Sequence, residues 1–113
     1  MRTEPLSEAW VDAIIGASVD RPSTPGLNGV AAVTIGKTKR AVLEIVEGRA
    51  VAPTGADPEV EIPVTAKQIA AWADGELSLS VGYMQGDLKP VGPTGPLLAV
   101  LELLDDPTIR VAV

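Results

Sequence analysis

The sequence predicts an α+β fold, in which one sheet of consecutive strands carries helices on one of its faces. Between residues 30 and 64, short β-branched and apolar segments alternate with turns that contain glycine or proline. On both sides of this region, apolar residues recur at the spacing of a helix face. Tight turns between strands favour antiparallel neighbours, and helices gathered before and after a run of strands are typical of the α+β class.

A first helix is expected to begin after Ser7, because its hydroxyl suits an N-cap and Glu8 follows in the first turn. One face of this helix is apolar and consists of Trp10, Ala13, Ile14 and Ala17. The segment Arg21–Gly29 is predicted to be a loop, since its prolines and glycines would break a helix.

Four strands are expected next, and they are Val30–Ile35, Ala41–Glu47, Arg49–Ala52 and Glu59–Val64. Turns at Gly36–Arg40 and Glu47-Gly48 and a loop at Pro53–Pro58 separate them. The last strand alternates most clearly, with Glu59 and Glu61 on one side and an apolar set on the other, which is Val60, Ile62 and Val64. This alternation is typical of a strand that is buried on one face only.

Two helices are predicted after the strands. The first begins after Thr65 and ends at Gly75, which suits a left-handed C-cap. The second is shorter, begins at Ser78 or Ser80 and ends at Gly86.

A fifth strand and a last helix complete the chain. The strand is Asp87–Val91, and Pro90 places it at a sheet edge or at a bulge because proline cannot donate to the ladder. The last helix runs from Leu97 to about Asp105, and Thr108–Val113 is expected to be a short apolar tail.

The composition excludes several classes of function. The 113 residues include no His and no Cys, which removes disulfides, thiolate catalysis, Cys/His zinc sites and a Ser-His-Asp triad. A formal net charge of −6 disfavours nucleic-acid binding. No signal peptide is apparent, and no apolar run reaches the roughly 18 residues of a membrane span. We therefore expect a soluble, cytoplasmic protein without a metal or cofactor.

Aliphatic residues must form the core, because the sequence has no Phe and its only aromatics are Trp10, Trp72 and Tyr83. Aliphatic walls suit either a plain core or a cavity for a long apolar ligand. Tyr83 and Met84 at the end of the short helix leave the same choice open. They either pack in the core, or Met84 lines an adaptable pocket while the Tyr83 hydroxyl meets a ligand head group.

The last helix is apolar around most of its circumference, interrupted by Glu102. Its apolar residues are Leu97, Leu98, Val100, Leu101, Leu103 and Leu104. Such a helix is either buried in the core or contacts a second apolar surface. In the second interpretation one face contacts the sheet and the other closes over a lipid.

The acidic pairs have simple interpretations. Glu59 and Glu61 belong to the solvated side of a strand, and Asp105-Asp106 is expected to be a solvated helix end rather than a pair of metal ligands. Carboxylates are mildly unfavourable at that end of a helix, and the sequence offers no reason for the pair.

The basic residues Lys37, Lys39 and Arg40 form one cluster at the predicted hairpin tip. They either keep the tip soluble or contact anionic lipid head groups at a membrane surface. The glycines of Gly92–Gly95 lack the pattern of a nucleotide-binding loop.

The order of several segments resembles the sterol carrier protein type 2 family of small lipid-binding domains. The resemblance extends from about Asn28 to Pro107. Its segments are Asn28-Gly29, Glu47-Gly48-Arg49-Ala50, Val60–Thr65 with Ile69 and Gly75-Glu76-Leu77, and Tyr83–Lys89 with Gly92. Tyr83 stands where the family usually has Phe, and Pro90 replaces a β-branched residue. The C-terminus lacks a peroxisomal tripeptide, so the chain resembles a bacterial-type stand-alone member.

This resemblance implies one domain over residues 1–113, with a twisted five-stranded sheet, helices on one face and an apolar tunnel between the layers. Family members bind fatty acids, fatty acyl-CoA, phospholipids or sterols and carry them without reacting on them. The expected function is therefore non-catalytic binding and intracellular transfer of a lipid. The residues expected to line the pocket are Ile45, Ile62, Trp72, Val81, Tyr83, Met84, Leu98 and Leu101.

A second interpretation is an accessory or dimerisation subunit that supports a partner enzyme. The pocket would then be collapsed, and the apolar last helix or tail would form the interface. An enzymatic activity of its own is disfavoured, because no nucleophile and base stand at a recognisable spacing.

Overall fold

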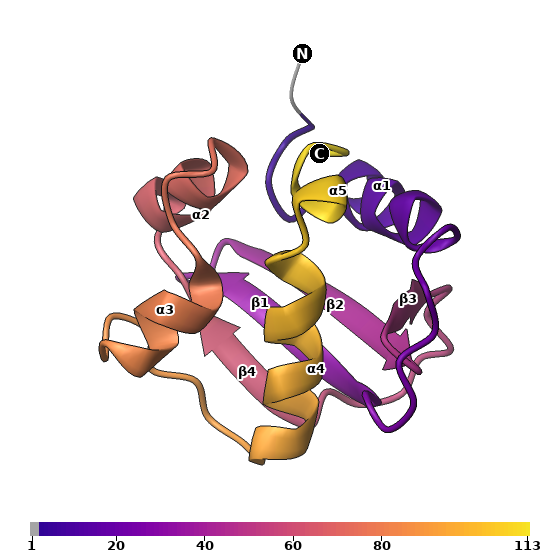
Figure 1. The fold of residues 1–113 in the computed structure, drawn as a ribbon. Helices are drawn as coiled ribbons and strands as arrows, with labels where there is room; N and C mark the ends of the chain where they lie inside the picture. The colour runs from indigo at the N-terminus through magenta and orange to yellow at the C-terminus, as the bar shows by residue number, and fades with distance from the viewer. Residues whose placement is uncertain (1–2) are drawn as a thin grey trace.

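In a computed structural model, which describes residues 3–113, the helices flank a small sheet (Figure 1). Five helices and four strands follow one another along the chain. They are α1 (Glu8–Ser18), β1 (Gly29–Ile35), β2 (Lys39–Val46), β3 (Arg49–Val51), β4 (Val60–Pro63), α2 (Ala66–Ala73), α3 (Leu79–Met84), α4 (Thr94–Leu104) and α5 (Pro107–Arg110). The α+β class is confirmed, and α5 forms at the start of the region where a short apolar tail, Thr108–Val113, was predicted.

The sheet is mixed, with the strand order β3-β2-β1-β4. The hairpins β1–β2 and β2–β3 are antiparallel as predicted, whereas β4 pairs with β1 in parallel. The meander expected from the turns therefore stops at β3. The chain crosses from one edge of the sheet to the other before β4, so β4 runs in the same direction as β1.

The segment between β3 and β4, residues 52–59, is called the crossing segment, and it is held on the sheet face that points away from the helices. Leu43 and Ile45 point to the helices, so Glu44 between them points the other way. The Glu44 carboxylate accepts a 2.8 Å hydrogen bond from the Thr54 hydroxyl and a second bond from the Thr54 backbone amide. Glu44 is buried despite its charge, because this crossing segment covers it.

The fifth strand predicted at Asp87–Val91 is absent, and the prediction of five strands was wrong. Only Val91 pairs with the sheet, through an isolated bridge to Glu61 with N···O distances of 2.8 and 2.9 Å. Pro90 has no amide to extend the ladder. At Gly92 the backbone turns away with φ +136°, and a Cβ there would lie 2.5 Å from the Glu59 carbonyl oxygen.

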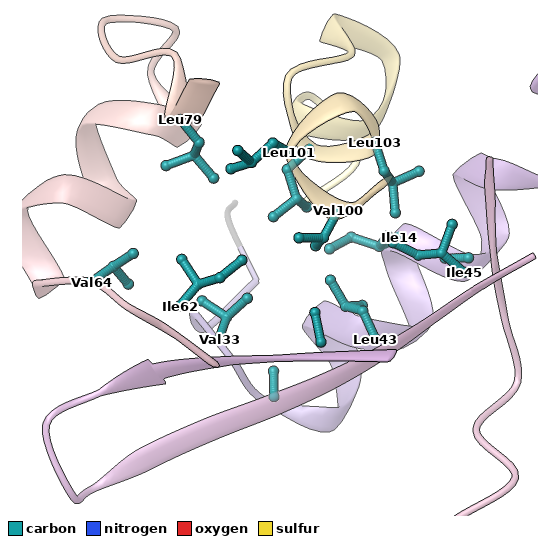
Figure 2. Close-up of a cluster of buried hydrophobic side chains, with 14 of the residues drawn as sticks. Ile14, Val33, Leu43, Ile45, Ile62, Val64, Leu79, Val100, Leu101 and Leu103 are labelled. Atoms are coloured by element: carbon teal, nitrogen blue, oxygen red, sulfur yellow. The ribbon is translucent and has the colours of Figure 1, made fainter. Parts of the chain in front are cut away.

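The helices cover one face of the sheet, with α4 lying between α1 on one side and α2 and α3 on the other (Figure 1). Side chains from alternate strand positions point into this layer and meet α3, α4 and α1 (Figure 2). Six residues of α4 are buried, and they are Leu97, Ala99, Val100, Leu101, Leu103 and Leu104. The buried interpretation of the last helix is therefore confirmed for most of its surface, and Leu98 and Glu102 point outward.

The predicted N-caps Ser7, Thr65 and Ser78 are confirmed, whereas α4 begins at Thr94, three residues before the predicted start at Leu97. The hydroxyl of Ser7 accepts the Trp10 amide, Ser78 accepts the Val81 amide, and Thr65 forms a capping box with Gln68. None of the helices in residues 3–113 is long and apolar enough to cross a bilayer.

Candidate functional site

The structure separates the eight residues predicted to line a pocket into an inner and an outer group. Ile45, Ile62, Trp72 and Leu101 are buried in one continuous apolar core. Figure 2 shows three of them, Ile45, Ile62 and Leu101, among the side chains between the sheet and the helices. The inner group thus lies in the layer where the resemblance places a tunnel.

The outer group faces solvent. Val81, Met84 and Leu98 are 47%, 82% and 54% exposed, while Tyr83 is half-buried and packs against the core. The reason lies in α3, where Leu79 and Gly82 form the buried side of the helix and leave the opposite side to solvent.

A groove of about 580 Å³ follows the outward side of α4 and contains two of the predicted residues, Leu98 and Leu101. We call it the α4 groove. Its lining residues are Arg21, Leu27, Ser80, Leu98, Leu101, Glu102, Asp105 and Asp106. In Figure 1 this side of α4 lies between α3 and the segment that leads from α1 to β1. Its volume is within the range of small-molecule sites, roughly 300–1,000 Å³.

Leu101 connects the α4 groove with the interior. It lines the groove, yet it is buried and belongs to the same apolar cluster as Ile62 and Trp72. The side chain of Leu101 is therefore the boundary between the α4 groove and the apolar layer above the sheet. A hydrocarbon chain that displaced Leu101 would pass from the groove into that layer.

Asp105 connects α4 to α3 at the end of the groove. Its carboxylate accepts the backbone amides of Leu79 at 2.8 Å and Ser80 at 3.0 Å, and it also accepts the Ser80 hydroxyl. A carboxylate is favourable at this position because the first amides of a helix lack partners and carry partial positive charge. The expectation of a solvated helix end was wrong for Asp105, which caps a different helix from its own.

Asp106 has an equally definite role. Its Oδ1 accepts the Thr108 amide and caps α5, while its Oδ2 accepts a 3.0 Å hydrogen bond from the Arg21 guanidinium. The side chain of Arg21 is only 10% exposed. The ion pair therefore fixes the segment after α1 against the C-terminal end of α4.

Trp72 holds α2 against the same end of α4. Its indole Nε1 donates a 2.7 Å hydrogen bond to the Leu104 carbonyl oxygen, one of the carbonyls that the end of a helix leaves without a partner. Trp10 meets Trp72 edge to face, with 6.0 Å between the ring centroids. Sequence reasoning missed these contacts, although a buried indole always calls for an acceptor.

The basic cluster at the β1–β2 hairpin is partly neutralised. Lys39 donates to the Glu4 carboxylate at 2.9 Å, and Arg40 lies 3.9 Å from Glu61. The hydrogen bond from Lys39 and its positive charge hold the pKa of the Glu4 carboxyl below its ordinary value. Glu61 is exposed, as predicted for the solvated side of its strand.

The other cavities described contain fewer of the eight residues predicted to line a pocket. One of about 460 Å³ lies between the start of α1 and β2 and has Glu8, Asp12 and Arg40 in its walls. Within residues 3–113, no three side chains of His, Cys, Asp or Glu gather to hold a metal ion. The α4 groove with the apolar layer beneath it is therefore the candidate site.

Comparison with solved structures identifies the fold. A sterol carrier protein 2 superimposes with a TM-score of 0.70 at 19% identity, covering 96% of this chain and 97% of that one. Palmitated SCP2L2 from Aedes aegypti gives 0.61 at 17% identity, covering 86% and 92%. UbiJ-SCP2, a ubiquinone synthesis protein, gives 0.55 at 17% identity, covering 93% of each chain.

Neither the protein-family models nor the curated protein sequences gave a match. The fold that the sequence resemblance predicted is nevertheless present, because three independent structures share it over most of their length. The chain has the sterol carrier protein fold, with four strands in its sheet.

Proposed function

We propose that this protein binds the hydrocarbon part of a lipid between its sheet and helices and carries it without reacting on it. The observation that carries this proposal is the position of Leu101, which separates the α4 groove from the apolar layer on a sterol carrier protein fold. One structure with this fold is named as palmitated, which supports a fatty acyl ligand.

The driving force for binding is removal of apolar surface from water. Each buried methylene contributes about 0.8 kcal/mol, less the cost of association and of ordering the chain. No built polar site in the α4 groove selects one head group, because Asp105 and Asp106 are already engaged with the protein's own helices. Fatty acids, fatty acyl-CoA, phospholipids and sterol-like ligands therefore remain candidates, and chain length should matter more than head group.

Opening of the layer would involve α3 and α4 moving apart. Asp105 is the polar link between them, and the rest of their contact is apolar. The exposed Val81 and Met84 on α3 would then face a ligand that lies between the helices, which is how these predicted residues would contribute.

The test compares hexadecanoate binding by delipidated protein and by Leu98→Gln, measured by native mass spectrometry and by titration calorimetry. Leu98 is 54% exposed in the groove, and Val46 is 50% exposed on a strand outside it, so Val46→Gln is the matched control. Loss of one apolar contact should weaken binding roughly tenfold for Leu98→Gln. Equal affinities for both variants, or no saturable binding by the wild type, would contradict the proposal.

A second candidate function is an accessory subunit, favoured by the likeness to UbiJ-SCP2, a ubiquinone synthesis protein. The α4 groove would then receive a segment of a partner enzyme or of a second copy of the chain. Sedimentation equilibrium at micromolar concentration checks the homodimer form of this function, and a monomer throughout would rule that form out.

A transient contact with an anionic membrane through Lys37, Lys39 and Arg40 belongs to the lipid-transfer proposal. Lys39 and Arg40 each have a carboxylate nearby, so the attraction should be weak and sensitive to salt. Co-sedimentation with vesicles that contain phosphatidylserine, at low and physiological salt, measures it. Vesicle binding that stays unchanged when Lys37, Lys39 and Arg40 are all replaced by Ala would exclude the hairpin as the contact.

A further inference from the structure

A separate apolar cavity of about 120 Å³ lies where the two ends of the chain meet. We call it the terminal cavity. Its walls come from the N-terminal segment, α1, α2 and the last residue, and they are Thr3, Pro5, Trp10, Ile69, Ala70, Trp72, Ala73 and Val113. It shares no residue with the α4 groove. Figure 1 shows the N-terminal segment passing between α2 and α5 at this place.

The lining of the terminal cavity suits a slim apolar group and does not suit water. Thr3 is the one wall residue with a polar side chain apart from the two indoles, and the Trp72 indole already donates to Leu104. A cavity of about 150 Å³ with aliphatic and aromatic walls stays dry and binds benzene-sized molecules. Since a water molecule occupies about 30 Å³ and a methylene group a similar volume, the terminal cavity has room for about four carbons.

Two walls of the terminal cavity are fixed before any ligand arrives. Trp72 is held by its hydrogen bond to Leu104, and Trp10 packs edge to face against it. Both rings are almost fully buried, so they lose little freedom when a ligand contacts them.

Thr3 and Pro5 form the N-terminal wall of the terminal cavity, and they belong to segment 3–6. Leu6 is buried with φ +61°, a left-handed conformation that costs an ordinary residue about 1 kcal/mol or more. Outside the cavity the segment is attached by the ion pair between Glu4 and Lys39, whose side chains are 70% and 37% exposed. Exposed pairs of this kind contribute little. The buried Leu6 anchors one end of the segment in the core, so Thr3 and Pro5 are the part of the wall that can move.

We propose that the terminal cavity binds the methyl end of an unbranched acyl chain, with Thr3 and Pro5 as its movable wall and the carboxylate end of the acyl chain outside it. This inference rests on the proposed lipid-binding function and assigns one end of the ligand to a place. It also makes Trp10 and Trp72 direct reporters, because the chain contains no other tryptophan.

Brominated fatty acids test the inference, since bromine quenches tryptophan emission only at contact. Delipidated protein is titrated with hexadecanoate, 16-bromohexadecanoate and 2-bromohexadecanoate, and native mass spectrometry of the same samples records how much is bound. We expect strong quenching by the 16-bromo acid and little by the 2-bromo acid at equal occupancy. Equal quenching by both, or bound ligand without quenching, overturns this inference and leaves the lipid-binding function intact. Absence of any adduct overturns both.

A variant that fills the terminal cavity provides the second arm. Ala70 lies at its rim and is exposed, so Ala70→Leu adds three carbons to the cavity without burying a misfit in the core. Ala66→Leu on the same helix lies outside the cavity and is the matched control. At about fourfold in affinity per displaced methylene, Ala70→Leu should weaken hexadecanoate binding at least tenfold and remove quenching by the 16-bromo acid. Wild-type affinity and quenching in a folded Ala70→Leu protein would refute the assignment.

Discussion

The indole of Trp72 donates a hydrogen bond to the Leu104 carbonyl oxygen at 2.7 Å, and this bond joins α2 to the C-terminal end of α4. It satisfies a donor that is buried and an acceptor that the end of a helix leaves without an internal partner. The same contact fixes one wall of the terminal cavity. The Trp72 side chain therefore contributes both to stability and to the ligand site that we propose.

Replacement of the Trp72 indole, which is the donor of this bond, should lower the free energy of unfolding. Trp72→Phe keeps an aromatic ring but leaves the Leu104 carbonyl oxygen buried without its partner, which costs about 1–3 kcal/mol. Trp10→Phe removes a similar volume next to it without removing this bond, and serves as the control. Chemical denaturation should show the larger loss of unfolding free energy for Trp72→Phe. The reverse order would mean that packing, and not the hydrogen bond, decides.

Asp105 should determine how firmly α3 is attached to α4. Asp105→Ala removes the acceptor of the Leu79 and Ser80 amides, and we expect a loss of about 1–2 kcal/mol. Amide hydrogen exchange should become faster in α3 while it stays unchanged in α1. Asp57→Ala, at an exposed loop position, is the control. Unchanged protection of α3 in Asp105→Ala would show that apolar contacts alone hold the two helices together.

Substitution of Gly92 and of Gly95 by alanine should have opposite effects on stability, although the two residues are only three positions apart. At Gly92 a Cβ would lie 2.5 Å from the Glu59 carbonyl oxygen, and φ is +136°, so Gly92→Ala should cost at least about 2 kcal/mol. At Gly95, in the first turn of α4, a Cβ meets nothing within 4 Å. Gly95→Ala should therefore stabilise the protein by about 0.5 kcal/mol. Thermal unfolding of the two variants measures the difference, and a similar Tm for both would contradict the geometry at Gly92.

The ion pair at segment 3–6 should respond to acid. Lys39 lowers the pKa of Glu4, so the pair contributes above the ordinary pKa of a glutamate and is lost as the pH falls through the lowered value. Lys39→Ala should return the Glu4 titration, followed by NMR, to its ordinary midpoint. Lys37→Ala should leave the Glu4 midpoint low, because Lys37 lies in the same hairpin without contacting Glu4. A low midpoint in Lys39→Ala would point to another cause of the shift.

Local features of the fold were predictable from the sequence. Ser7, Thr65 and Ser78 cap their helices through amides no more than three residues away, so the neighbouring residues contain the whole signal. The alternation in β4 likewise reports burial on one face within a few residues. These predictions were confirmed because nothing distant in the chain competes with them.

Contacts between residues that are distant in the sequence could not be predicted from it. The pairing of β4 with β1 depends on where the crossing segment lies, and Glu44 and Thr54 hold it there through contacts between residues ten positions apart. Asp105 is unfavourable within its own helix and favourable at the start of α3, a relationship invisible from neighbouring residues. Pro90 was predicted to place a strand Asp87–Val91 at a sheet edge or at a bulge. That this strand is reduced to a single bridge at Val91 follows from the close approach of Gly92 to the sheet.

For the predicted pocket residues as well, the sequence did not determine which side chains point inward. Leu98 was one of six similar apolar residues on α4, and only packing decided that it would point outward. In α3, six residues are too few to show a periodic face, so Val81 and Met84 could not be oriented. Ile62 and Trp72 are buried in the apolar core, and their place in the lining of a lipid pocket stays a prediction.

The mixed sheet also has a consequence for how the chain folds. The antiparallel hairpins β1–β2 and β2–β3 close over short turns. The strand β4 instead pairs with β1 across a long separation in the sequence, for example between Val60 and Ala31. Closing a long loop costs chain entropy before its contacts form, so the three-stranded meander should form early and β4 should dock late. Pulse-labelled hydrogen exchange during refolding would then show β2 amides protected before those of β4. In that interval the exposed side of β1 is an unpaired strand edge, and this is the stage at which two chains would associate wrongly.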